Sequence, residues 1–139
     1  MAKTFFFRLF GLGKMPEQFR ANLNSEGMLL FDEGIKASVT YLDFRAPGKR
    51  SAWRRQWFSA CIALTQVRLV ALQYSNQAIN VPFTDDRIRR LRLSIEGDET
   101  LLIAFDPSLF HQDWSGTMEY RFRTSQAKAF LKMLHERTA

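Results

Sequence analysis

The chain has 139 residues, 46% of them hydrophobic and 24% charged, and carries a formal net charge of +6 at pH 7. This composition excludes a disordered or fibrous protein and indicates one soluble globular domain that is large enough to bury its own core. The positive charge favours polyanionic partners, namely nucleic acid, an anionic membrane face or an acidic protein.

The start of the chain combines aromatic and basic residues. An apolar run from Phe5 to Leu12 is interrupted by Arg8 and is too short to span a bilayer. Because no small-residue cleavage site follows the run, we expect no secretory signal. The run can lie in a membrane interface as a helix with its cations at headgroup level, or pack on the domain or on a second copy of it.

A short helix is predicted from Pro16 to Leu23, because proline is tolerated in the first turn of a helix. It ends at residues that disfavour helix: Asn24, Ser25 and Gly27. The chain is therefore divided into an N-terminal aromatic and helical extension, residues 1–24, and a domain, residues 25–139.

The middle of the chain shows strand patterns rather than helical ones. The predicted strands in this part are 28–31, 35–44, 57–64, 68–74 and 78–83. Turns are expected at residues 32–34, where Asp, Glu and Gly follow one another, and at Asn76 and Gln77. Pro82 places the last of these strands at a sheet edge or at a strand end.

Alternation is clearest in the second half. Apolar and polar residues alternate over residues 90–96, and the sequence Glu-Gly-Asp-Glu at 96–99 predicts a hairpin with the strand 100–105. A loop over residues 106–115 is followed by Gly116 and by a strand at 117–122. Met118, Tyr120 and Phe122 lie on one side of that strand.

The last element is an amphipathic helix that Thr124 or Ser125 can cap. Its apolar stripe consists of Ala127, Phe130, Leu131 and Leu134. A single helix after an antiparallel sheet needs an apolar surface to cover, and the mouth of a curled sheet provides one. We therefore predict a mainly β (α+β) fold: a bent antiparallel sheet of about seven strands, forming an open barrel or sandwich capped by the C-terminal helix.

The residue patterns of catalytic and metal sites are missing from the sequence. His111 and His135 are far apart and lack metal-ligand spacing, and the acidic pairs fall at predicted turns. Residues 11–14 resemble part of a phosphate loop but lack its remaining glycine and hydroxyl positions. Cys61 lies in an apolar run, which predicts a buried thiol and fits a reducing cytoplasm. We expect no enzymatic activity, no metal and no cofactor.

The main candidate site is the segment RAPGKRSAWRRQW, Arg45 to Trp57, which holds five cations and two tryptophans and no acid. We interpret it as a basic loop. Its cations can hold phosphates while tryptophan lies at interfacial depth or stacks on a base. Alternatively, Trp57 points into the core and the cations solvate a flexible loop. The candidate binding residues are Arg45, Lys49, Arg50, Trp53, Arg54 and Arg55.

A second basic cluster is expected on the polar side of a strand. It consists of Arg87, Arg89, Arg90 and Arg92. These residues either extend a basic face or form ion pairs with neighbouring acids, and pairing is the preferred interpretation. The expected acidic partners are Asp85, Asp86 and Glu96.

Two stretches, LTQVRLVAL at 64–72 and INVPFTDDRI at 79–88, together with the order of the other parts, resemble the pleckstrin-homology (PH) superfold. The chain is similar in particular to bacterial PH-like and GRAM-like domains, over about residues 25–136. The resemblance implies a seven-stranded bent sheet capped by the C-terminal helix, and a binding module for lipid headgroups, peptides or proteins. Gln56 stands where the phosphoinositide-binding pattern has arginine. Phe130 and Leu134 replace a tryptophan common in the helix of that family.

The sequence therefore supports one leading hypothesis and two alternatives. The leading hypothesis is a non-enzymatic PH-like binding module, cytoplasmic or peripheral at the inner face of the membrane, that contacts an anionic membrane surface or a protein partner. The first alternative is a homo-oligomeric assembly domain without a lipid ligand, formed by edge-strand pairing or through the N-terminal segment. Nucleic-acid binding ranks last, because a recognition helix and the paired aromatics of an RNA-binding sheet are missing.

Overall fold

The computed structural model describes residues 14–138, so the expectations for the aromatic run lie outside the described residues. Seven antiparallel strands form one sheet in the order β4-β3-β2-β1-β7-β6-β5. The strands are β1 (Met28–Ala46), β2 (Lys49–Thr65), β3 (Arg68–Gln73), β4 (Asn76–Pro82), β5 (Arg92–Glu96), β6 (Thr100–Phe105) and β7 (Ser115–Arg123). The helices are α2 (Glu17–Ser25), α3 (Ala127–Thr138) and the short 3-10 helices η1 (Asp86–Arg90) and η2 (Pro107–Leu109). The predicted mainly β fold is confirmed, and the sheet is not closed.

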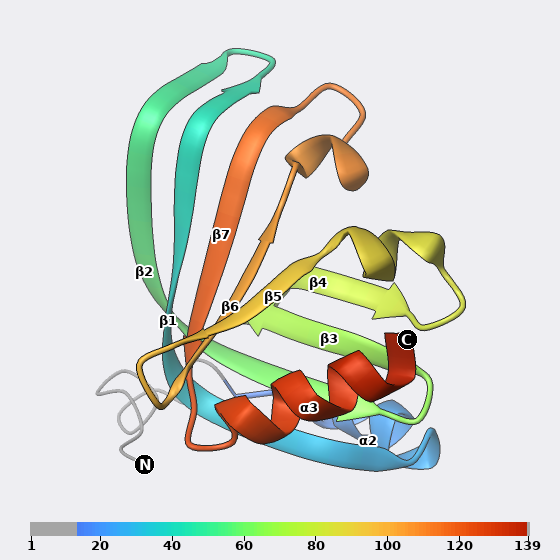
Figure 1. Ribbon diagram of the computed structural model, residues 1–139. Helices are drawn as coiled ribbons and strands as arrows, with labels where there is room; N and C mark the ends of the chain where they lie inside the picture. The colour runs from blue at the N-terminus through green and yellow to red at the C-terminus, as the bar shows by residue number, and fades with distance from the viewer. Residues whose placement is uncertain (1–13, 139) are drawn as a thin grey trace.

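The sheet bends around α3, which lies against its concave face (Figure 1). Ala127, Phe130 and Leu134 are fully buried there among apolar residues of six strands. The start of the helix is held by Thr124, whose Oγ1 accepts a 3.1 Å hydrogen bond from the Gln126 N–H and donates a 2.7 Å bond to the Asp32 carboxylate. The prediction that the apolar stripe of the C-terminal helix covers an apolar surface of the sheet is confirmed.

The opposite, outer face of the sheet is covered only in part, by α2. Met15 and Leu23 are buried against Cys61 and Ala63 of β2 and against β3. Since side chains alternate along a strand, Phe58, Ala60 and Ile62 point to the opposite face and pack with α3. Both faces of β2 are thus buried after Phe58, which explains its long apolar run.

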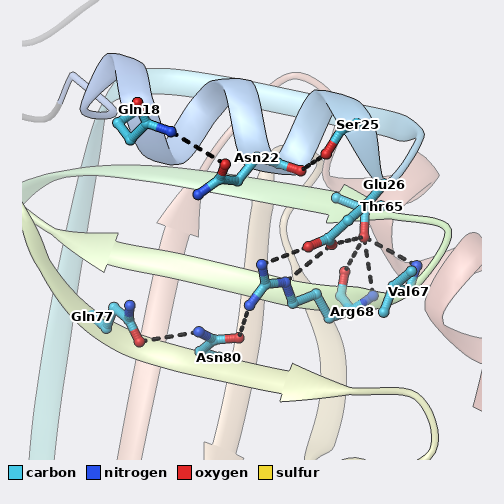
Figure 2. Close-up of polar contacts among 9 residues, drawn as sticks. All are labelled: Gln18, Asn22, Ser25, Glu26, Thr65, Val67, Arg68, Gln77 and Asn80. Atoms are coloured by element: carbon cyan, nitrogen blue, oxygen red, sulfur yellow. Dashed lines mark hydrogen bonds and ion pairs between the residues drawn. The ribbon is translucent and has the colours of Figure 1, made fainter.

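The C-terminal end of α2 is anchored by Glu26 (Figure 2). Its carboxylate accepts hydrogen bonds from Arg68 Nε at 3.0 Å and Nη2 at 2.6 Å, and from Thr65 Oγ1 at 3.1 Å. Arg68 also donates to Asn80 on β4. One ion pair therefore fixes the helix to β3 and to the turn that precedes it.

Three expected turns and loops are placed differently by the structure. The turn expected at 32–34 is wrong: β1 runs through it with a bulge at Gly34, whose φ of +66° suits a glycine. The basic loop expected at 45–57 is wrong as well, because β1 and β2 pair up to Ala46 and Lys49 and leave a two-residue turn at 47–48. The turn expected at 76–77 lies two residues earlier, and β4 begins at Asn76.

The remaining strand predictions agree closely with the structure. β4 is an edge strand that ends at Pro82, and residues 97–99 connect β5 to β6 as a hairpin. Met118, Tyr120 and Phe122 are all buried on one side of β7. The loop expected at 106–115 contains η2, and its last residue already belongs to β7.

Candidate binding face of the β1–β2 ribbon

The far halves of β1 and β2 form a ribbon that extends away from both helices (Figure 1). We use the term distal ribbon for residues 39–46 of β1 and 49–57 of β2. Val39 and Phe44 of its β1 half are buried, whereas none of the side chains from Lys49 to Trp57 in its β2 half is buried, so charged and polar residues occupy both faces of that half. The six candidate binding residues of the sequence analysis all lie in the distal ribbon.

The structure divides these six residues between different surfaces. Trp53 and Arg55 lie on the outer face of the sheet, whereas Lys49 and Arg54 line a hollow on the other face. Arg45 and Arg50 are directly opposite each other next to the turn. The six residues are close in sequence, but they do not form one continuous binding surface.

A row of aromatic and basic side chains runs along the outer face of β2. Trp53 and Trp57 are 62% and 57% exposed, and the guanidinium of Arg55 lies 5.5 Å and 5.8 Å from their ring centroids. Arg55 Nε donates a 2.8 Å hydrogen bond to Thr40 Oγ1 on β1. The interpretation in which Trp57 points into the core is wrong, because the alternation of β2 gives that place to Phe58.

A second arginine, Arg121 of β7, extends this row across the sheet. Its Nη1 donates to Thr40 Oγ1 at 3.3 Å and to Glu119 at 3.1 Å. Its Nε and Nη2 donate to the two carboxylate oxygens of Glu96 at 2.7 Å and 3.1 Å. The hydrogen bond from Arg121 lowers the pKa of Glu96, which therefore stays ionised at neutral pH.

The hollow on the other face of the ribbon has a volume of about 130 Å³. Aromatic rings in edge contact form its floor, with centroid distances of 4.8 Å from Tyr41 to Phe44 and 5.3 Å from Phe44 to Trp114. Burial raises the pKa of Tyr41, while the charge of Arg54 acts in the opposite sense. Sequence reasoning missed Tyr41 and Trp114, since they are separated by more than half the chain.

Two of the four arginines in the second basic cluster form ion pairs within residues 14–138. Arg87 pairs with Asp85 at 2.7 Å and Arg89 with Asp86 at 3.1 Å, so the preferred interpretation is confirmed for these two. The cluster was predicted to lie on a strand. This is correct only for Arg92, because Arg87, Arg89 and Arg90 belong to η1. The expected role of Glu96 is also wrong, since that carboxylate is held by β7.

Cys61 is fully buried, as predicted, and packs in one cluster with Leu23 of α2. Burial, with the charge of Glu33, raises the pKa of its thiol to about 12.

Within residues 14–138, no three His, Cys, Asp or Glu side chains are grouped to hold a metal ion. His111 stacks on Trp114 at 3.7 Å between ring centroids. None of the helices in this range has the length and apolar character needed to cross a membrane.

Comparison of the sequence with protein-family models gives no match. Comparison with curated proteins gives none either.

Proposed function

We propose that this protein is a non-enzymatic binding module with a PH-like fold, and that its distal ribbon binds an anionic membrane surface. The observation that carries the proposal is the exposure of Trp53 and Trp57 on one side of a ribbon rich in cations. Aromatic side chains of this kind insert at the level of lipid headgroups, and basic ones are attracted to anionic lipids.

The tip of the ribbon carries charge that the described residues do not neutralise. Arg45 and Arg50 are exposed and opposed across the two strands, and Lys49 is beside them. None of the three forms an ion pair within residues 14–138. Like charges in opposed positions are unfavourable in a sheet unless an external anion lies near them. This arrangement supports an anionic partner at the tip.

The expected strength follows from the number of cations. Each basic residue near an anionic surface contributes about 1 kcal/mol, so three at the tip contribute roughly 3 kcal/mol. Such binding is weak without the tryptophans and falls steeply with ionic strength. We therefore expect reversible attachment that needs both the cations and the indoles.

The architecture supports the PH-like part of the proposal. The number of strands, the bent sheet and the helix on its concave face are the features that the resemblance implies. On this proposal the protein works in the cytoplasm and attaches peripherally to the inner face of the membrane. A protein partner with an acidic surface could use the same cations.

Cosedimentation with lipid vesicles tests the proposal. Phosphatidylcholine vesicles with a rising fraction of phosphatidylglycerol are compared at about 0.05 M and 0.5 M ionic strength. The tip variant Arg45→Gln/Lys49→Gln/Arg50→Gln should bind at least about tenfold more weakly than the unchanged protein. The matched control, Arg89→Gln/Arg90→Gln/Arg92→Gln, removes the same charge elsewhere and should bind nearly as well as the unchanged protein.

Two outcomes would reject membrane binding by the ribbon. One is the absence of binding to phosphatidylglycerol vesicles at the lower ionic strength. The other is equal weakening in the tip variant and its control, which would mean that net charge alone is responsible. The variant Trp53→Ala should also bind more weakly, with no change in charge.

Homo-oligomerisation is a second candidate function, because the sheet leaves β4 and β5 as edge strands. Edge strands present backbone groups that can pair with another chain. Light scattering on the full chain and on a chain without residues 1–13 separates the two routes to assembly. If both the full chain and the shortened chain have a mass above that of a monomer, strand pairing is favoured. If both are monomers, homo-oligomerisation is rejected.

A further inference from the structure

A hollow of about 240 Å³ lies on the outer face of the sheet, between the uncovered part of β2 and the β5 edge. It is separate from the tip of the ribbon and from the hollow beneath Tyr41. Its lining comes from five adjacent strands and includes Lys36, Ser38, Trp57, Glu96, Arg121 and Arg123.

Ser38 is the feature that distinguishes this hollow from an ordinary surface depression. Its side chain is fully buried, and its Oγ has no hydrogen-bond partner within residues 14–138. A buried hydroxyl without a partner costs about 1–3 kcal/mol, and the great majority of such groups in proteins are satisfied. Since Ser38 lines the hollow, a ligand in it can supply the missing acceptor.

The charges around the hollow favour an anion. Arg121 is already paired with Glu96 and Glu119, whereas Lys36 and Arg123 form no ion pair within residues 14–138. The Lys36 ammonium lies 4.7 Å from the centroid of the Trp57 ring, which holds it at the wall of the hollow. Two positive charges therefore remain for a ligand, beside one hydroxyl donor and one exposed aromatic face.

We propose that this hollow binds a phosphate monoester. A phosphate monoester carries a charge of about −1.5 to −2 at pH 7 and three strong acceptor oxygens, which matches two free cations and the Ser38 hydroxyl. Thr100, in the same lining, offers a second hydroxyl. The volume of the hollow, about 240 Å³, equals that of roughly eight water molecules at about 30 Å³ each. It therefore has room for a phosphate group and for part of the carbon portion of the ligand, which can lie on Trp57.

The ligand chemistry has two sources, a soluble phosphate monoester and the headgroup of a monoester lipid such as phosphatidic acid. The hollow shares the outer face with Trp53 and Trp57, so a lipid headgroup could be bound while the ribbon contacts the membrane. Only this lipid source rests on the proposed function. The soluble source does not.

The first experiment titrates the full-length protein with glycerol 3-phosphate by calorimetry, with sodium acetate as the monoanion control. Replacing Ser38 by alanine should weaken binding about tenfold, because a hydrogen bond to a charged group is lost. Arg123→Gln should weaken it by a similar factor. Arg92→Gln removes the same charge from the outer face at β5 without lining the hollow, and should leave binding unchanged.

The stability of the Ser38→Ala variant separates a binding role from a structural one. Because the Ser38 hydroxyl has no partner, its removal should not lower the free energy of unfolding. A second reporter is the emission of Trp57 in a Trp53→Phe/Trp114→Phe background, which leaves it as the only tryptophan. That emission should change with glycerol 3-phosphate and not with acetate.

The second experiment compares vesicles of phosphatidic acid with vesicles of phosphatidylglycerol, a diester, at matched surface charge. A preference for phosphatidic acid that Ser38→Ala abolishes supports the lipid source, and binding of glycerol 3-phosphate without such a preference supports the soluble one. Absence of both, while phosphatidylglycerol binding persists, overturns the phosphate site and leaves the proposed function intact. Binding of glycerol 3-phosphate without any vesicle binding supports the site and rejects the membrane function.

Discussion

Arg55 of β2 donates a hydrogen bond to Thr40 of β1, with 2.8 Å between Nε and Oγ1. The same hydroxyl accepts a bond from Arg121 of β7, so one buried side chain connects three strands on the outer face. Its position fixes the guanidinium of Arg55 between Trp53 and Trp57. The threonine thereby orients the aromatic and basic row of the proposed binding face.

Replacing Thr40 by valine tests this connection, because the shape of the side chain is kept while the acceptor is lost. We expect the free energy of unfolding in urea to fall by about 1 kcal/mol, the usual contribution of one or two such bonds. The vesicle affinity should also fall, since Arg55 is no longer held. Thr117→Val, on the same face of β7, is the control. Equal effects of the two substitutions would contradict the assigned role.

Trp57 and Phe58 are neighbours in sequence and lie on opposite faces of β2. Phe58 is 5% exposed in the core, so Phe58→Ala should lower the free energy of unfolding by about 3–5 kcal/mol. Trp57→Ala should lower it by less than about 1 kcal/mol, because only its contacts with Lys36 and Arg55 are lost. Urea denaturation of both variants measures the difference. A larger loss for Trp57→Ala would place the indole in the core.

The ion pair between Glu26 and Arg68 should contribute more to stability than the exposed pair between Lys128 and Asp98. It is bidentate, and both side chains are only 22% exposed. We expect Glu26→Gln to lower the free energy of unfolding by about 1–2 kcal/mol. Lys128→Gln, which removes an exposed pair with Asp98 at 3.8 Å, should change it by less than about 0.5 kcal/mol. Equal losses would mean that α2 is not held by this pair.

Much of the sheet could be predicted because one of its faces is buried. Apolar residues on every second position of β7, such as Tyr120 and Phe122, mark the side that packs on α3. The stripe on α3, with Phe130 and Leu134, has the spacing of a helix that covers a core. These patterns reflect burial directly, and the structure confirms them.

The β2 half of the distal ribbon could not be predicted as strand, because none of the side chains from Lys49 to Trp57 is buried. Without a buried side its sequence loses the alternation that marks a strand, and its cations resemble those of a loop. The β1 half, which buries Val39 and Phe44, lies largely within the predicted strand 35–44. The bulge at Gly34 was missed for a related reason: Asp-Glu-Gly has the composition of a turn, and only the pairing with β2 keeps the strand continuous.

The candidate sites were the least predictable part, since strand register creates them. Ser38 and Arg121 are opposite each other on β1 and β7 although 83 positions separate them in sequence. Lys36 lies on the same face two positions before Ser38 on β1, and the pairing of β1 with β2 brings Trp57 next to Ser38. A sequence pattern without the register contains no sign of this arrangement.

Cys61 should make stability decrease in alkaline solution. Burial raises its thiol pKa from 9.0 to about 12 in the folded state, so as the pH rises the unfolded chain loses this proton first. The contribution to stability is present below pH 9 and is lost between pH 9 and 12, by at most about 1.4 kcal/mol per pH unit. Urea denaturation at several pH values above 8 should therefore show a steeper decline for the unchanged protein than for Cys61→Ala. The substitution lowers stability at every pH through lost packing, so the comparison concerns the slopes. Equal slopes would show that the thiol is not protected from ionisation in the folded state.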